Sequence, residues 1–400
     1  MRFSGRTAWD VAETRLARAL RERRESGLEL LDLTASNPTR CGFRYDEAGI
    51  LAALGDREAL VYDPEPRGML RAREAVCRYY AERGARVAPQ QVFLTTSTSE
   101  AYSWVFRLLC DAGDEVLIAQ PSYPLFDFLA QIEDVRLVPY PLVYDHGWQV
   151  DLEGLQGRVT ERTRAIALVH PNNPTGHWTR ERRELEALCV ERGLALIVDE
   201  VFLDSFAEGG TRLRGRETVP RGESFAVGEH PCLTFVLSGI SKIAALPQMK
   251  AAWIAAFGPE AELGEALERL EVVADTFLSM NAPVQCALPS WLASAGGMQE
   301  QIRQRTAANL RALDAVLAGV PAVTRLEVEA GWYAVLRVPA LGSDEELAVR
   351  LVEQRGVSVH PGYFFGFPGA GWLVVSLLPE EEEFRRGVEA VCAEFGGGRD

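Results

Sequence analysis

The amino-acid sequence predicts an α/β protein built on a mostly parallel, seven-stranded sheet with helices on both faces. Seven short apolar runs are continuous rather than alternating, as is typical of strands buried on both faces. They occupy residues 92–96, 115–119, 135–139, 165–169, 195–199, 233–237 and 251–256. Helical periodicity lies between them, most clearly at residues 70–83, 99–110, 180–192 and 260–273. Strands that alternate with helices favour a sheet covered on both sides.

The rest of the chain predicts a second, smaller α+β domain. Four hundred residues exceed one typical hydrophobic core. We expect an N-terminal arm and part of the small domain at 1–44, the large domain at 45–285 and the small domain at 286–400. After Pro289 a charged helix at 298–317 precedes strand candidates at 324–329, 332–338, 357–360 and 373–377. The stretch 207–231 predicts a long surface excursion, and the tail 396–400 a frayed end.

Composition excludes several classes of function. The net charge of -15 argues against a nucleic-acid binder, which needs a basic face, and disfavours binding to anionic membranes. No apolar run reaches the roughly 20 residues of a spanning helix, and the N-terminus lacks the apolar segment of a signal peptide. Seven scattered cysteines favour reduced thiols in a cytoplasm. We find no H-E-x-x-H, G-x-S-x-G or Walker motif and predict no metal site.

Polar side chains follow the ends of several apolar runs, where ligands collect in parallel α/β sheets. Asp199 ends one run, and the segment HPNNPTG, which contains Asn173, follows another. Lys242 comes after the run 233–237 and has apolar neighbours, a poor setting for a solvated charge. Three hydroxyl residues lead from the run 92–96 into a helix, namely Ser97, Thr98 and Ser99.

In this order, and with Tyr62 and Tyr123, these residues make the sequence similar to the class I/II aminotransferase family of fold type I enzymes. That family depends on pyridoxal 5'-phosphate (PLP). The resemblance runs over nearly the whole chain, and its most specific pieces are Asn172-Asn173-Pro174-Thr175-Gly176, Asp199-Glu200 and Ser241-Lys242. It implies that Lys242 holds the cofactor in a Schiff base and, once displaced by the substrate amine, moves the α-proton.

The resemblance also implies roles for the residues that precede Lys242. Asp199 keeps the pyridine nitrogen protonated, Asn173 hydrogen-bonds the phenolic oxygen, and Tyr123 stacks on the ring. The residues alone leave plainer alternatives open: a helix cap for Asp199, a simple turn for Asn173 and a core aromatic for Tyr123.

The phosphate group is expected at the start of the helix after Ser97, Thr98 and Ser99, although an ordinary N-cap is the alternative. Ser238 and Lys250 are further candidates for binding it. Lys250 stands where the family commonly has an arginine, so it supplies the charge without the bidentate fork. Tyr62 matches a tyrosine that reaches the phosphate of the partner subunit, which implies a homodimer with a shared active site. A packed tyrosine is the alternative.

Two departures from the family pattern bear on the substrate. Many relatives have a tyrosine three residues after the pyridine aspartate, whereas this chain has Phe202. Most bind the substrate carboxylate with an arginine on a late strand, whereas residues 371–378 contain none. Arg40 and, less strongly, Arg44 are candidates to replace it, the alternative being that both are solvated.

These observations predict a PLP-dependent aminotransferase acting on an amino acid, or a similar amine, and a keto acid. The main alternative is a lyase, cyclase or oxidase on the same fold, because substrate orientation decides which bond at Cα breaks. A regulatory domain that only binds PLP is disfavoured, since the acid–base groups are complete and no DNA-binding segment is attached.

Overall fold

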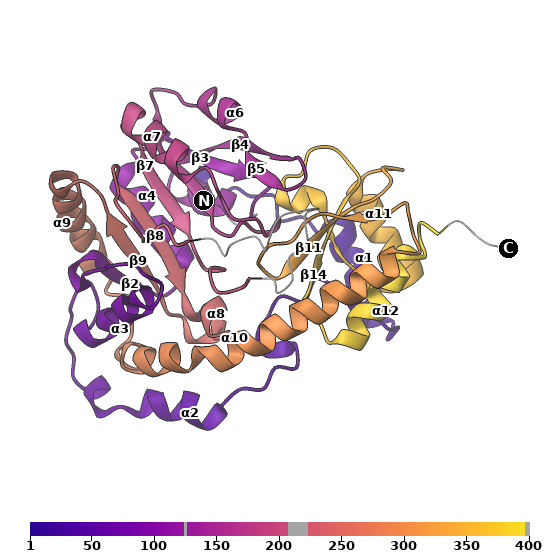
Figure 1. Ribbon diagram of the computed structural model, residues 1–400, viewed down its shortest axis with the longest axis horizontal. Coiled ribbons are helices and arrows are strands. Elements are labelled where there is room, and N and C mark those ends of the chain that lie inside the picture. Colours follow the sequence, from indigo (N-terminus) through magenta and orange to yellow (C-terminus); the bar gives the residue numbers. More distant parts are fainter. Residues whose placement is uncertain (124–125, 207–222, 397–400) are drawn as a thin grey trace.

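The computed structural model describes residues 1–123, 126–206 and 223–396, and its centre is an eight-stranded sheet (Figure 1). The order across the sheet is β2 (Val92–Thr95), β9 (Ala252–Phe257), β8 (Thr234–Gly239), β7 (Ala195–Asp199), β6 (Thr163–Val169), β3 (Glu115–Gln120), β4 (Arg136–Tyr144) and β5 (Trp148–Val150). All seven predicted strands are present, so the predicted α/β class is confirmed.

Two strands differ from the prediction. β9 runs antiparallel to both of its neighbours, β2 and β8, whereas its continuous apolar sequence predicts a parallel strand. A fully buried strand is continuously apolar whichever way it runs, so its sequence does not encode its direction. The eighth strand, β5, is antiparallel to β4. It has only three residues and is therefore too short to produce a recognisable pattern.

Helices cover both faces of this sheet because successive strand side chains point to opposite sides. Ile197 of β7 packs in a cluster with α4 (Thr98–Leu109), α5 (Phe126–Ile132) and α9 (Glu260–Phe277). Leu196 and Val198 pack on the other face with α3 (Leu70–Ala81), α7 (Arg182–Arg192) and α10 (Ala282–Leu317). Short helices occur at α2 (Glu47–Ala52), α6 (Leu152–Gln156) and α8 (Ile240–Ile243). The result is a three-layered α/β body with its core on both sides of the sheet.

The C-terminal residues form a second sheet with the order β10 (Thr324–Arg325), β11 (Tyr333–Arg337), β14 (Trp372–Ser376) and β13 (His360–Pro361). The predicted strand at 357–360 is divided, because β12 (Val357–Ser358) pairs instead with β1 (Leu31–Asp32). This unit is completed by α1 (Arg15–Glu25), α11 (Asp344–Arg350) and α12 (Glu381–Cys392). N-terminal and C-terminal residues thus share one core, while the boundaries 1–44, 45–285 and 286–400 stay a prediction.

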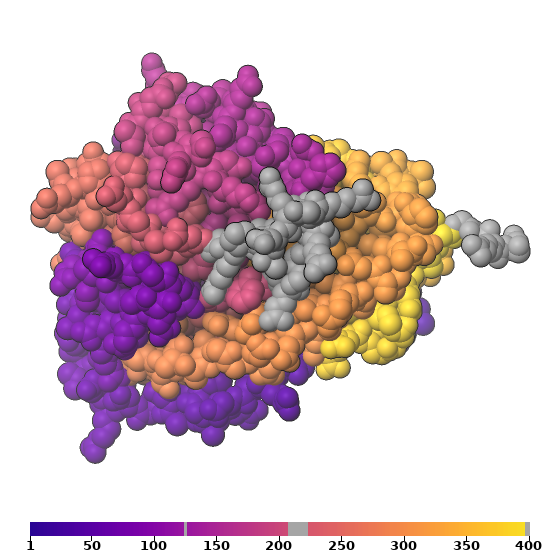
Figure 2. All heavy atoms as spheres, viewed as in Figure 1, coloured from indigo at the N-terminus to yellow at the C-terminus, as the bar shows by residue number. Residues whose placement is uncertain are grey.

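Helix α10 extends along both units (Figures 1 and 2). We predicted a helix at 298–317, but it begins at Ala282, where the side chain of Asn281 accepts from the amide of Val284 at 3.0 Å. It continues through Pro289, which usually breaks a helix. Leu288 and Trp291 on either side are buried in the core, so packing outweighs the local preference.

Most of the predicted excursion at 207–231 and the tail at 397–400 lie outside the described residues. Within the described ranges, no helix combines the length and apolar character that crossing a membrane requires.

Candidate active site

A cavity of ≈ 170 Å³ lies at the carboxyl ends of β6, β7 and β8. The sequence predicts a ligand site at these strand ends. Six of the predicted site residues line it together: Thr98, Ser99, Tyr123, Asn173, Asp199 and Lys242. Phe202 also lines it and is almost fully buried. These residues come from segments up to about 140 positions apart, so folding brings together side chains that are distant in the sequence.

Asp199 is the last residue of β7 and is buried, with 6% of its surface exposed. Its Oδ1 accepts a hydrogen bond from the amide of Val201 at 3.0 Å. Burial raises the pKa of Asp199 to about 7, and the Val201 amide, the charge of Lys242 and the hydroxyl of Tyr102 oppose this rise. A buried carboxylate gains most from a cationic partner. A protonated pyridine nitrogen is a group of that kind.

Lys242 lies in α8, directly after β8. Burial lowers the pKa of its amine to about 8, and the Asp199 carboxylate opposes the fall. The chain has only two lysines, Lys242 and Lys250, so 40 of its 42 Lys and Arg residues are arginine (42 − 2). A Schiff base needs a primary amine, which a guanidinium cannot replace. The presence of a lysine at position 242, in a chain that otherwise uses arginine almost exclusively, was therefore an unused indication of a Schiff-base residue.

Asn173 belongs to the turn after β6 and is buried, but its Oδ1 has no hydrogen-bond partner among the described residues. The turn itself is fixed: Asn172 donates to Thr175 Oγ1 at 2.8 Å. Gly176 has φ +68°, and a Cβ there would collide with the carbonyl oxygen of Ala330. Buried polar groups are normally paired. A fixed turn with an unpaired polar side chain in the cavity wall therefore fits a polar ligand, and the amide N–H of Asn173 is the group that could donate to the phenolic oxygen of PLP.

The start of α4 is the predicted phosphate site. Ser97 is the N-cap, and its Oγ accepts from the amide of Glu100 at 3.1 Å, so this hydroxyl is occupied within the helix. Thr98 and Ser99 face the cavity. Ser238 is buried, and its Oγ donates to the carbonyl oxygen of Glu200 at 3.4 Å rather than lining the cavity. The first turn of α4 is therefore the part that can meet an anion directly.

Besides Ser97 and Ser238, four predicted residues do not line this cavity in the described part of the chain. Lys250 is exposed. Tyr62 is 83% exposed and borders a separate cavity of ≈ 230 Å³. Arg40 is exposed in the short helix Pro38–Arg40, although Ser36, four residues earlier, does line the site. Arg44 is also exposed, and its amide donates to Gln301 Oε1 at 3.0 Å. The roles of these residues stay predictions.

The sequence did not reveal the residues that the smaller sheet contributes. Tyr333 of β11 is buried, and it lines the cavity together with Ser36. Burial raises the pKa of the Tyr333 hydroxyl to about 12, so it stays neutral. Trp332 is fully buried, and its ring centroid lies 4.6 Å from Lys242 Nζ. Only the three-dimensional contact between the two sheets identifies these side chains.

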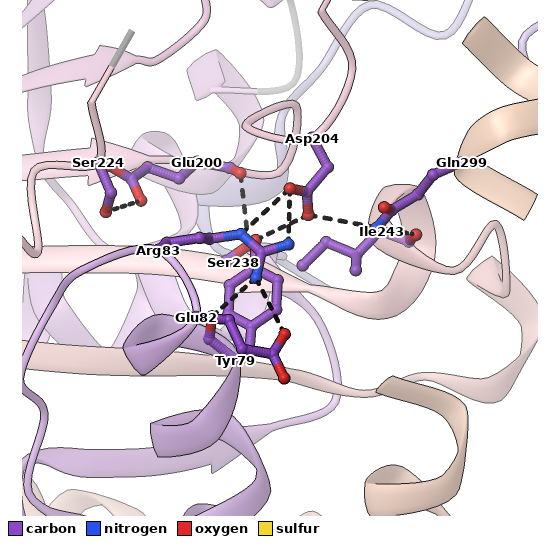
Figure 3. Close-up of polar contacts among 9 residues, drawn as sticks. All are labelled: Tyr79, Glu82, Arg83, Glu200, Asp204, Ser224, Ser238, Ile243 and Gln299. Atoms are coloured by element: carbon purple, nitrogen blue, oxygen red, sulfur yellow. Dashed lines mark hydrogen bonds and ion pairs between the residues drawn. The ribbon is translucent and has the colours of Figure 1, made fainter. Parts of the chain in front are cut away.

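A buried ion pair fixes the turn that follows β7 (Figure 3). Arg83 donates to Asp204 through Nε at 3.1 Å and Nη2 at 2.7 Å, and the Tyr79 hydroxyl donates to the same carboxylate at 3.0 Å. Gln299 of α10 donates to Asp204 at 3.4 Å and to the carbonyl of Ile243 at 3.1 Å. The two turns that flank the cavity are thus tied to each other and to α10.

Comparison with known proteins agrees with this geometry. The family model described as aminotransferase class I and II matches residues 47–391. The chain is 27% identical to an alanine aminotransferase of Mycobacterium tuberculosis, over 91% of this chain and 85% of that protein. It is 28% identical to the arginine–pyruvate transaminase AruH of Pseudomonas aeruginosa, over 97% and 95%. A solved alanine aminotransferase of Pyrococcus furiosus aligns with a TM-score of 0.88 at 22% identity, covering 98% of this chain and 99% of that one.

Proposed function

The chain belongs to the class I and II aminotransferase family, whose members are PLP-dependent transaminases, and on this premise we propose a role for each residue of the cavity. The lyase, cyclase or oxidase alternative is not favoured, because the curated relatives named above are aminotransferases. The observation that carries the proposal is the single cavity that holds Lys242, Asp199 and Asn173 together.

The residues of the cavity fit the cofactor at each of its polar groups. Asp199 pairs with the pyridine nitrogen, and the Asn173 amide binds the phenolic oxygen. The first turn of α4, with Thr98 and Ser99, receives the phosphate through its N–H groups and hydroxyls. Tyr123 supplies an aromatic face. Ser97, Ser238 and Lys250 remain proposed contributors to the phosphate site, the first through its backbone.

When bound, PLP supplies an electron sink for the charge that develops at the substrate Cα. Lys242 is the group that moves the proton. With a pKa of about 8, its amine is partly neutral near pH 7 to 8, and only the neutral amine accepts a proton from Cα. Burial, which lowers this pKa, therefore prepares Lys242 to act as a base at ordinary pH.

The substrates are an amino acid and a keto acid, as in the aminotransferase relatives. We propose the alanine–pyruvate couple as one pair, because the names of relatives 23–28% identical to this chain include alanine, glutamate–pyruvate and arginine–pyruvate transaminases. Arg40 remains our candidate for the substrate carboxylate, since β14 and its flanks carry no arginine at 371–378.

We also propose a homodimer in which Tyr62 reaches the phosphate of the partner subunit. Leu60, Val61 and Tyr62 are consecutive, strongly exposed side chains of large apolar area, which suits a covered interface. A cytoplasmic location is proposed from the seven cysteines, all of which are free.

Single-turnover spectroscopy tests this function. Protein loaded with PLP is mixed with L-alanine, and the cofactor spectrum should convert to that of the amine form and return when pyruvate is added. A screen of other amino donors by the same change identifies the second couple. If the cofactor regains its starting spectrum without a keto acid, or never changes with any amino acid, transamination is excluded.

A further inference from the structure

The side-chain amine of Lys242 lies against two aromatic rings. Its Nζ is 4.6 Å from the ring centroid of Trp332 and 5.6 Å from that of Phe202, and it sits over both rings. The two rings meet edge to face, with centroids 5.4 Å apart and an interplanar angle of 83°. Ammonium groups are attracted to the faces of aromatic rings within about 6 Å, most strongly to tryptophan.

Both rings are held in place. Trp332 is fully buried, its Nε1 donates to Ser205 Oγ at 3.1 Å, and its carbonyl accepts from the Leu377 amide at 2.7 Å. Phe202 and Ser205 belong to the same turn after β7, and the amide of Ser205 donates to the carbonyl of Phe202 at 2.8 Å. The ion pair of Asp204 fixes that turn from the other side (Figure 3). The indole of Trp332 and the turn that carries Phe202 are therefore both anchored beside the amine.

The titratable groups around the amine are few. Among the described residues, Asp199 is the charged group that acts on Lys242. Two hydroxyls, those of Tyr123 and Tyr333, also line the cavity, and burial raises both pKa values, so these groups are neutral at ordinary pH. Once Asp199 is paired with the pyridine nitrogen of the cofactor, part of its charge is compensated, and the aromatic faces are a second source of stabilisation for a positive charge on Nζ.

We propose that Trp332 and Phe202 form an aromatic site that holds the Lys242 ammonium while it carries the proton taken from the substrate. This proposal rests on the proposed role of Lys242. The Cα–H bond breaks, its electron pair stays with the substrate, and the proton forms the third N–H bond of Nζ. One N–H bond of the ammonium breaks when the proton is delivered to C4′ of the bound cofactor, the electron pair stays on Nζ, and Lys242 returns neutral. Without the rings, a buried ammonium would lose its proton too readily to hold it between its removal from Cα and its later release.

The small number of lysines makes the test direct. Protein labelled with lysine ¹³C at Cε gives signals from Lys242 and Lys250 alone, and a Lys250→Arg sample assigns them. The protein is loaded with pyridoxamine phosphate, so that Lys242 has no covalent bond to the cofactor, and its pKa is read from the ¹³Cε shift against pH. The readout does not depend on turnover.

The decisive comparison is between Trp332→Phe, which keeps a ring face, and Trp332→Leu, which removes it. Phenylalanine and leucine are both smaller than tryptophan, so each variant leaves a space that water can enter. Such water should change the pKa of Lys242 by a similar amount in the two variants. The Lys242 pKa should be lower in the leucine variant by about 0.5–1 unit, the proton affinity that a cation–π contact confers. Equal pKa values, or a higher value with leucine, would overturn the proposal.

Should Trp332→Leu fail to fold, uniform incorporation of fluorinated tryptophan gives a second test, because fluorine weakens the ring face with little change in size. The pKa of Lys242 should then fall in the wild type but not in Trp332→Phe, which retains the other seven tryptophans. An equal response in both proteins contradicts the proposal. If reductive trapping instead places the cofactor on another residue, the role of Lys242 fails independently of the rings.

Discussion

Glu200 should make the stability of this protein fall as the pH rises towards neutrality. Its carboxylate is fully buried next to Asp199, and it accepts from the Phe225 amide at 2.6 Å and the Ser224 hydroxyl at 2.7 Å. Burial nevertheless raises its pKa to about 7, against these two hydrogen bonds. An unfolded glutamate titrates near pH 4.3, so the folded chain keeps a proton that the unfolded chain has lost.

The gap between pKa values of about 4.3 and about 7 corresponds to about 3.7 kcal/mol at 1.36 kcal/mol per unit, of which about 3 kcal/mol falls between pH 4.5 and 8. Because the folded pKa is the higher one, this stabilisation is complete below about pH 4.3 and is lost as the pH rises through about 7. Glu200→Gln cannot titrate. The free energy of unfolding of the wild type should therefore fall by about 3 kcal/mol relative to Glu200→Gln between about pH 4.5 and 8.

Urea unfolding of both proteins, at one PLP concentration and across this pH range, measures the difference. His170 and His177, whose pKa values burial lowers to about 3, titrate in both proteins and cancel. A difference that does not change with pH would mean that Glu200 is ionised in the folded protein and would contradict this account.

Further substitutions test the other assignments. Asp199→Ala should retain some PLP but lose most transamination, because the pyridine nitrogen is no longer held protonated; near-normal kcat would remove Asp199 from the mechanism. Tyr62→Phe should weaken PLP retention, and mixed with Lys242→Ala it should regain activity, since one site of the mixed dimer has both residues intact. Absence of complementation despite subunit exchange would contradict a shared site. Arg40→Ala should reduce kcat/KM for the amino donor by about 1.5–3 kcal/mol in transition-state terms, the value of a lost hydrogen bond to a charge. An unchanged kcat/KM would show that another group binds the carboxylate.

The strands of the large sheet, and the cavity residues that follow them, could be predicted because each is marked by a short stretch of sequence. A buried strand appears as one apolar run, and Asp199 and Lys242 follow the ends of two of them. The direction of β9 and the start of α10 could not be predicted in this way. The first depends on pairing with distant strands, and the second on core packing that outweighs Pro289.

The contribution of the smaller sheet is the part that sequence reasoning lacked. Ser36, Trp332 and Tyr333 reach the site only because residues near both ends of the chain pack against the end of the large sheet. No motif near Trp332 marks it as a neighbour of Lys242. The lysine content of the whole chain was an available signal, since two lysines beside 40 arginines narrow the candidates for a Schiff base to positions 242 and 250 without any structure.

Reduction of the PLP-loaded protein with borohydride, followed by proteolysis and mass spectrometry, tests the central claim most directly. The chain has only two lysine side chains that can form the adduct, so the experiment decides between Lys242 and Lys250. We expect the reduced cofactor on the peptide that contains Lys242, and its loss from that position in Lys242→Ala. A cofactor fixed to Lys250, or a reducible adduct that persists unchanged in Lys242→Ala, would contradict the account.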